Sequence, residues 1–182
     1  MALETPPRAI DPIHYREVLG NFATGVTVVT AMDGRQPIGT TVNSFTSVSL
    51  DPPMVLICVG RERSIHPVIA RTRRFAVNIL REDAQDLSDC FSGAPTELPR
   101  EAFCNAAHRL GESGAPILWS ALAHLECEVE RTLEAGDHTI HLARVTDLEA
   151  DDRTGLPLLY FGGRYLRIER AAASELRGKP DA

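Results

Sequence analysis

The sequence lacks long apolar runs, an excess of positive charge and a secretory signal. No apolar run approaches the roughly 20 residues that a membrane-spanning helix needs. The start, MALETPPRAIDP, lacks the basic-then-apolar order of a secretory signal, so the expected compartment is the cytoplasm. The formal net charge is −6, with 19 Lys and Arg against 25 Asp and Glu, which argues against a broad nucleic-acid or anionic-membrane surface. We therefore expect neither nucleic acid nor a membrane as a partner.

Several common catalytic motifs are also missing. There is no G-x-G-x-x-G and no Walker A motif, which excludes the usual doubly wound nucleotide-binding folds. There is no H-E-x-x-H, no G-x-S-x-G and no pair of acids in an obvious catalytic setting. Whatever chemistry the chain performs, the sequence shows no side-chain constellation of a common hydrolase.

Metal-binding patterns are equally scarce. His138 and His141 are closely spaced near a turn, but an offset of three on a strand points two side chains to opposite faces. We therefore expect no metal site. The cysteines form no C-x-x-C pair, and we expect buried, reduced thiols rather than disulfides at all four positions. These are Cys58, Cys90, Cys104 and Cys127.

The length of 182 residues suits one domain, with a core at about 12–168 and a polar tail at about 170–182. Asp11-Pro12 predicts the start of a helix that runs to about Phe22. SIHPVIART predicts a second short helix with Ser64 as its candidate cap. EDAQDLSDCFSG predicts a third, which Gly93 ends.

The remaining patterns are typical of strands. In AHLECEVERTL, Ala123, Leu125, Cys127 and Val129 alternate with four polar residues, which predicts a strand with one wet face at His124, Glu126, Glu128 and Glu130. The run EAGDH ends this strand and TIHLARVTDLEA returns as a second one. PPMVLICVG is apolar throughout, so we expect both of its faces to be covered. PLLYFGGRYLRI predicts a hairpin with the turn Gly162-Gly163.

The short connections between strands decide the fold class. Most consecutive strands are joined too tightly for helical crossovers, so the sheet should be mainly antiparallel. A closed or partly closed β-barrel with a few peripheral helices satisfies this pattern most simply. We therefore expect a mainly β protein.

Residues 39–53, GTTVNSFTSVSLDPP, pose a separate question, because residues 40–49 carry uncharged polar side chains on both alternate faces of what looks like one strand. A strand half buried in a core would keep its polar residues on one side. Arg61 and Arg63 flank the start of the helix that Ser64 may cap, which fits either a phosphate site or a solvated basic turn. Isoalloxazine attached to a phosphate would use both features. Hydride transfer to a flavin also needs little side-chain acid–base chemistry.

Five motifs in the same order resemble the short-chain flavin reductase family, the NAD(P)H:flavin oxidoreductase components of two-component monooxygenases. They are FATGVTVVTA, GTTVNSFTSVSLDPPMVLICVG, RFAVNIL, AGDH and PLLYFGGRY, and the resemblance runs from about residue 12 to 168. It implies a flavin-binding split barrel of antiparallel Greek-key type and a homodimer. It also implies FMN or FAD as the flavin, NADH or NADPH as the reductant, and a separate monooxygenase that receives the reduced flavin.

The resemblance also implies site residues, by position. It implies that His138, in the G-D-H turn, and Tyr165, in the closing hairpin, bind the nicotinamide nucleotide. It implies that fourteen positions along the other motifs bind the flavin, and that Arg63 and Ser64 form the turn on its phosphate side. They are Thr41, Asn43, Ser44, Ser47, Val48, Ser49, Cys58, Val59, Gly60, Arg63, Ser64, Phe91, Ser92 and Gly93.

Other interpretations remain open at this point. Thr41 and Asn43 could satisfy backbone groups at a strand end, His138 could be an ordinary turn histidine, and Tyr165 an ordinary aromatic at the barrel rim. A non-catalytic flavin-binding protein would keep the polar segment but oxidise no nicotinamide. A pyridoxamine-phosphate oxidase would need a second basic phosphate pocket, and the chain's ending, RGKPDA, lacks an arginine-rich closing segment. A structural dimerisation protein would leave the polar segment unexplained.

Overall fold

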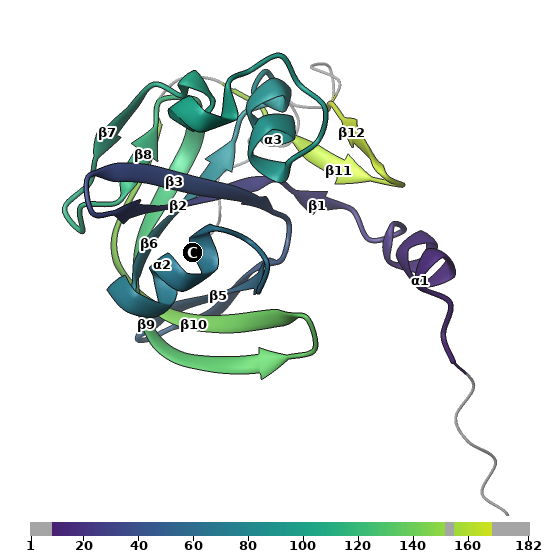
Figure 1. The fold of residues 1–182 in the computed structure, drawn as a ribbon, viewed down its shortest axis with the longest axis horizontal. Coiled ribbons are helices and arrows are strands. Elements are labelled where there is room, and N and C mark those ends of the chain that lie inside the picture. The colour runs from purple at the N-terminus through teal and green to yellow at the C-terminus, as the bar shows by residue number, and fades with distance from the viewer. Residues whose placement is uncertain (1–8, 152–154, 169–182) are drawn as a thin grey trace, which may run out of the picture.

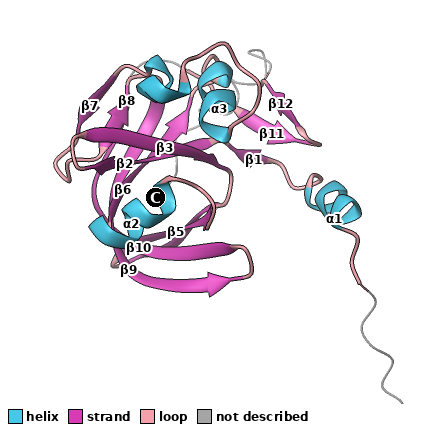
Figure 2. Cartoon of the chain, in the orientation of Figure 1, coloured by secondary structure: helices cyan, strands magenta, loops and turns pink. Residues whose placement is uncertain are grey.

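The computed structural model describes residues 9–151 and 155–168, and the expected polar tail at 170–182 lies outside them. Strands dominate, with a few helices at the periphery (Figures 1 and 2). The helices are α1 (Pro12–Leu19), α2 (Ile65–Thr72), α3 (Gln85–Ser92) and the 3₁₀ helix η1 (Arg100–Asn105). The strands are β1 (Thr24–Gly25), β2 (Thr27–Asp33), β3 (Gln36–Val42), β4 (Phe45–Leu50), β5 (Pro53–Gly60), β6 (Arg74–Leu80), β7 (His108–Leu110), β8 (Pro116–Leu118), β9 (Ala121–Ala135), β10 (His138–Ala150), β11 (Leu159–Phe161) and β12 (Arg164–Leu166).

The main sheet has seven strands in the order β3-β2-β6-β9-β10-β5-β4, and every pairing in it is antiparallel. Its two edge strands, β3 and β4, are consecutive in the chain and are joined only by Asn43 and Ser44. Because two residues span only about 7–10 Å between strand ends, the sheet must curl until its edges nearly meet. The prediction of a mainly antiparallel, partly closed barrel is therefore confirmed.

The same break corrects the expectation of one polar strand at 40–49. β3 ends at Val42 and β4 begins at Phe45, so the polar residues belong to opposite edges of the sheet. Their mixed faces have a physical reason, because the segment is two strand ends and the corner between them.

The helices begin and end largely where the sequence predicts. The Asp11 carboxylate accepts a hydrogen bond from the Ile13 amide at 3.1 Å and so caps α1, which ends at Leu19, earlier than expected. Gly93 ends α3 with φ +88°, a conformation that favours glycine. Ser64 occupies the cap position of α2, but its side chain makes no capping hydrogen bond. Among the described residues, no helix is long and apolar enough to cross a membrane.

Two apolar clusters fill the fold. The first lies within the curled sheet, where Val29, Ile57 and Phe75 pack against Ile65 and Ile69 of α2. In Figure 1, α2 accordingly sits in the opening of the curled sheet. The second lies beneath α3, and its members include Val28, Leu80, Phe91, Phe103 and Leu158. These clusters fix α2 and α3 against the sheet, and both helices border the candidate site.

The expectation for the cysteines is wrong in part. Cys90 of α3 and Cys104 of η1 form a disulfide, so these two are not free thiols. Sequence spacing gave no sign of the pair, because a positive-φ turn at Phe103 and Cys104 brings η1 back towards α3. Cys127 is free and buried, and burial raises the pKa of its thiol to about 12. Cys58 is free but only half-buried.

Two expectations about strand faces also need correction. The face of β9 expected to be wet is dry at His124 and Glu126, because the turn of the β7–β8 hairpin covers it. β5 was expected to be covered on both faces. It buries Val55, Ile57 and Val59 on one side, whereas the other side stays half-exposed at Met54, Leu56 and Cys58.

Candidate functional site

A cavity of about 740 Å³ lies at the corner between β3 and β4, and we call it the cradle. Four parts of the chain form its walls: α1, the end of β3 with the following corner, the end of β5, and the β9–β10 turn. Its lining residues are Pro12, Tyr15, Arg16, Leu19, Thr40, Thr41, Val42, Asn43, Ser44, Cys58, Gly60, Arg63, Ala135, Asp137, His138 and Ile140.

Hydrogen bonds hold the polar corner in place. The Ser44 hydroxyl donates to the Cys58 carbonyl at 3.0 Å and accepts from the Cys58 amide at 3.2 Å. The Thr41 hydroxyl donates to the Ser88 carbonyl at 2.7 Å, so towards a ligand it offers only acceptor lone pairs. The exposed Asn43 amide has no hydrogen-bond partner among the described residues. Of the three side chains, Asn43 is the one with both a donor and an acceptor free.

The β9–β10 turn brings His138 to the cradle. His138 lies opposite Gly60 in the β10–β5 register, and the Arg61 amide donates to the Asp137 carbonyl at 2.9 Å. The His138 Nδ1 lies 2.7 Å from Asp137 Oδ1, and this hydrogen bond lowers the pKa of the Asp137 carboxyl. Nδ1 therefore carries the proton, and Nε2 has no partner among the described residues. About half of the side chain is exposed, at 49%.

A second hollow of about 420 Å³ adjoins the cradle and shares Thr41, Val42 and Asn43 with it. Tyr165 lines it, and the Tyr165 hydroxyl lies 2.8 Å from the Ser88 hydroxyl. Burial raises the pKa of the Tyr165 phenol, and the hydrogen bond with Ser88 offsets part of this. Because Tyr165 and His138 line different hollows, the structure does not place the two predicted nicotinamide residues side by side.

A third hollow, of about 220 Å³, shares Thr40 and Arg63 with the cradle. The Arg63 Nη1 donates to the Ser92 carbonyl at 2.9 Å, which ties the start of α2 to the end of α3. Ser64, Phe91 and Gly93 complete this region. A guanidinium beside an uncapped helix N-terminus is a suitable environment for a phosphate.

Twelve of the sixteen predicted site residues line the cradle or one of the two adjoining hollows. The other four, Ser47, Val48, Ser49 and Val59, line none of the three. Val59 is fully buried in the core. Ser47, Val48 and Ser49 lie on β4, where a register shift marks a bulge between Ser47 and Ser49. Since β4 pairs only with β5 among the described strands, its outer backbone groups are available to a ligand or a partner.

Sequence reasoning missed several residues of the site. Tyr15, Arg16 and Leu19 of α1 line the cradle, but the sequence of this short helix does not indicate what the helix faces. Ser88 organises the second hollow through Thr41 and Tyr165, and its place inside a helix concealed it. Gly39 was also missed. A Cβ built there would lie 2.9 Å from the Phe91 ring, so glycine lets β3 approach α3 closely.

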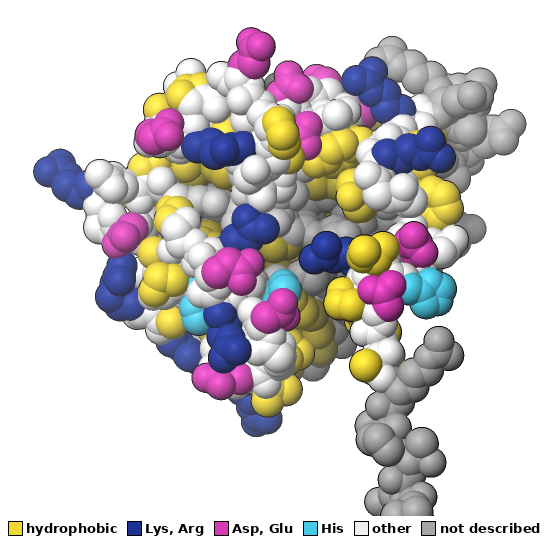
Figure 3. Space-filling model, turned by 45° about the vertical axis from the view of Figure 1, so that its right-hand side comes forward, with side chains coloured by type: hydrophobic (Ala, Val, Ile, Leu, Met, Phe, Trp, Pro, Cys, Tyr) yellow, Lys and Arg dark blue, Asp and Glu magenta, His cyan; other side chains and the backbone are white. Residues whose placement is uncertain are grey.

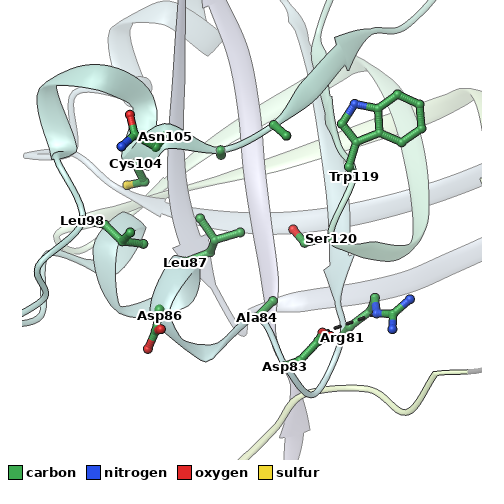
Figure 4. A pocket seen from close by; sticks show the side chains of 12 residues that line it. Arg81, Asp83, Ala84, Asp86, Leu87, Leu98, Cys104, Asn105, Trp119 and Ser120 are labelled. Atoms are coloured by element: carbon green, nitrogen blue, oxygen red, sulfur yellow. Dashed lines mark hydrogen bonds and ion pairs between the residues drawn. The ribbon is translucent and has the colours of Figure 1, made fainter.

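Another cavity of similar size lies elsewhere on the described residues. It measures about 770 Å³, between the start of α3, η1 and the β8–β9 corner, and Trp119 borders it (Figure 4). Arg81 and Asp83 form an ion pair at one side of it. None of the sixteen predicted residues lines this cavity. It offers an alternative location for a ligand, and a binding experiment can distinguish it from the cradle.

The face of the molecule drawn in Figure 3 shows no large area of one charge. In Figure 3, acidic and basic side chains are interspersed over the visible face, and hydrophobic side chains gather on the projecting part at the right. That part includes α1 and its flanks, which expose Ile10, Ile13, Val18, Leu19 and Phe22.

Comparison with known proteins places the chain among flavin reductases. Residues 19–169 match the flavin reductase like domain. A probable flavin reductase of Rhizobium meliloti is 44% identical over 147 residues, which are 80% of this chain and 46% of that protein. The reductase subunit HsaB of a flavin-dependent monooxygenase of Rhodococcus jostii is 37% identical, over 88% of this chain and 80% of that protein.

A solved structure agrees with these sequence matches. The NADH:FAD oxidoreductase SgcE6 of Streptomyces globisporus, in complex with NAD and FAD fragments, superposes with a TM-score of 0.80. It is 40% identical, and the match covers 94% of this chain and 99% of that one. Family match, relatives and fold all agree: this chain belongs to the flavin reductase like family and has its split-barrel fold.

Proposed function

We propose that this flavin reductase binds FAD or FMN across the cradle and the adjoining third hollow, and reduces it there with NADH. One observation carries the proposal: a neutral polar corner and an arginine-bearing helix start border the same cavity, through Thr40–Ser44 and Arg63. The first suits the rim of an isoalloxazine ring and the second suits a phosphate. A cavity of this size is in the range of small-molecule sites, about 300–1,000 Å³.

Each polar residue near the corner makes a different contact with the bound flavin. Ser44, fixed to the β5 backbone, keeps the corner open, and the Asn43 amide donates to and accepts from the ligand rim. Thr41 supplies an acceptor, and Arg63 offers its remaining guanidinium donors to a phosphate. When bound, the flavin supplies the hydride acceptor, so the protein needs only to hold and orient the two partners.

His138 serves the nicotinamide nucleotide, NADH or NADPH, rather than the flavin. Its Nδ1 is engaged by Asp137, and Nε2 remains to accept a hydrogen bond from a ribose hydroxyl or a carboxamide. Cys58 and Gly60 form the floor beside it. Tyr165, in the second hollow, contributes to the nucleotide part that lies beyond Asn43.

Reduced flavin then passes to a separate monooxygenase component, and we place this exchange in the cytoplasm, where NADH is abundant. Support comes from relatives that are reductase components of monooxygenase systems. The Cys58 side chain at the edge of the cradle is half-exposed, which suits a flavin that enters and leaves.

The active unit is a homodimer. Helix α1 buries none of its own residues, and an isolated eight-residue helix is only marginally stable in water. Its apolar side chains, like Val48 and Leu50 on β4, are exposed groups that a second copy would cover. Sedimentation at micromolar concentration should give twice the mass of one chain. Val18→Asp should lower that mass, whereas the neighbouring exposed Glu17→Gln should leave it unchanged, and a wild-type mass of one chain would refute the dimer.

His138→Ala tests the assignment of the nicotinamide side. We expect a higher apparent KM for NADH and a fall in kcat/KM of about 5–30-fold, which corresponds to a lost positioning contact of about 1–2 kcal/mol. Flavin affinity should stay nearly unchanged, because His138 is not needed to hold the flavin. Steady-state kinetics at saturating flavin, paired with a flavin titration, measures both quantities.

A matched control is His14→Ala, which removes an exposed histidine from α1 that does not line the cradle. Its kinetics should equal those of the wild type. If flavin binding collapses in His138→Ala while the dependence on NADH persists, the turn belongs to the flavin site and the assignment is wrong.

A further inference from the structure

We propose that His124, Glu126 and Asp147 form a binding site for a divalent transition-metal ion such as Zn²⁺, separate from the cradle. One donor atom from each side chain lies within 4.8 Å of the donor atoms of the other two. The cluster lies on β9 and β10, and none of its members lines the cradle or the two adjoining hollows.

The strand geometry explains how the three side chains meet. His124 and Glu126 are two residues apart on β9, so they point to the same face of the sheet. Asp147 is the register partner of Glu126 on β10, and partners in an antiparallel pair share a face. A register shift between Val145 and Asp147 marks a β-bulge at this point, and bulges redirect side chains.

His124 is the observation that points to a ligand. The residue is only 6% exposed, and its Nε2 is buried without a hydrogen-bond partner among the described residues. A buried ring nitrogen without a partner is costly unless something binds it. Asp147, by contrast, is exposed and has no hydrogen bond or ion pair with the described residues. A metal ion between the two would satisfy both.

Glu126 is fully buried, yet it keeps room for a metal. Its Oε1 accepts from the Glu112 amide at 2.9 Å, and its Oε2 accepts from the amide and the hydroxyl of Ser113, with the amide at 2.6 Å. A carboxylate has about four acceptor positions, so one remains on Oε1. The turn of the β7–β8 hairpin therefore holds the Glu126 carboxylate in one orientation. Outer-sphere hydrogen-bond donors orient metal ligands in the same way.

Charge and donor type select the class of ion. The carboxylates of Glu126 and Asp147 balance a 2+ charge, while the nearby Glu149 is already paired with Arg109 at 2.9 Å. An imidazole with two carboxylates suits Zn²⁺ and its transition-metal neighbours, whereas Mg²⁺ and Ca²⁺ prefer oxygen alone. Zinc–ligand distances of about 2.0–2.2 Å require the donors to draw closer, and the exposed Asp147 is free to move. A hollow of about 290 Å³ lies beside His124.

This site departs from the expectation of no metal site, which rests on the spacing of His138 and His141 and on the cysteine spacing. His124 and Glu126 were assigned to a wet strand face, where such a pair would be unremarkable. Once the β7–β8 hairpin covers that face, the same two residues become a buried donor pair.

The test is Zn²⁺ binding to the purified chain by calorimetry and by thermal melting, after treatment with a chelator. We expect one saturable Zn²⁺ per chain and a rise in melting temperature of a few degrees at saturation. Asp147→Asn and His124→Gln should each weaken binding by more than about 10-fold, because each removes a direct ligand and the loss of an outer-sphere partner alone costs about 10–100-fold. Glu134→Gln, an exposed carboxylate on the same strand, should bind Zn²⁺ like the wild type.

Three results would overturn the proposal: no saturable Zn²⁺ uptake by the wild type, unchanged affinity in Asp147→Asn, or an equal rise in melting temperature with Mg²⁺. If His124→Gln fails to fold, Asp147→Asn decides alone, because the Asp147 side chain is exposed and makes no hydrogen bond or ion pair with the described residues. Binding that persists in Asp147→Asn at the wild-type affinity would assign the uptake to other histidines.

Discussion

Asn43→Leu is expected to weaken flavin binding by about 5–150-fold while the protein stays folded. Asn43 is exposed at the corner between β3 and β4, and its amide is unpaired among the described residues, so folding does not depend on it. In the complex, leucine would leave a polar group of the flavin without its partner, at a cost of about 1–3 kcal/mol. A fluorescence titration with FAD and FMN measures the change directly.

The matched control for Asn43→Leu is Thr46→Val on β4. Thr46 is exposed, lies three residues further along the same polar segment and lines none of the three hollows. Its replacement by a side chain of similar size should leave flavin affinity unchanged. Equal affinity in wild type and Asn43→Leu would show that the polar corner does not contact the flavin.

The free energy of unfolding should fall by about 3 kcal/mol as the pH drops from about 6.5 to about 4, because of His141. His141 lies on β10 beside His66 of α2 and is only 1% exposed. Neither of its ring nitrogens has a hydrogen-bond partner among the described residues. Burial, together with the nearby His66 and Arg73, lowers the pKa of His141 from 6.5 to about 4. In this pH range the unfolded chain binds the proton and the folded chain does not, so acid favours unfolding.

Urea unfolding at a series of pH values tests this dependence. His141→Leu should flatten the profile between pH 6.5 and 4, since it removes the titrating group. His14→Leu, at an exposed position on α1, should keep the wild-type slope. A wild-type profile that His141→Leu leaves unaltered would assign the acid sensitivity to other groups.

Local signals predicted most of the fold. Asp11-Pro12, Gly93 and Gly162-Gly163 specify caps and turns through backbone chemistry that acts within a few residues, and each lies where expected. The alternation along β9 predicted a long strand, and Gly136 with φ +63° supports the turn into β10. Such caps, turns and strands can be predicted from local sequence without knowing which segments pack against them.

The errors arose where distant segments cover one another. Nothing within β9 shows that the turn at Glu112 and Ser113 covers Glu126. The Cys90–Cys104 disulfide depends in the same way on the path of η1. The corner at Asn43 was hidden because β-forming residues continue on both sides of it, and only the sheet order reveals that two edges meet there. The residues of α1 joined the site for a similar reason, through tertiary packing rather than pattern.

We expect the flavin to bind in the cradle and not in the cavity beside Trp119. Amide hydrogen exchange with and without FAD tests it most directly, because both locations include backbone amides. We predict slower exchange at residues 41–44, 58–63 and 136–138 when FAD is present, and unchanged exchange at 84–87 and 105–107. Protection at 84–87 and 105–107 with none at 41–44 would place the flavin in the cavity beside Trp119 and contradict its assignment to the cradle.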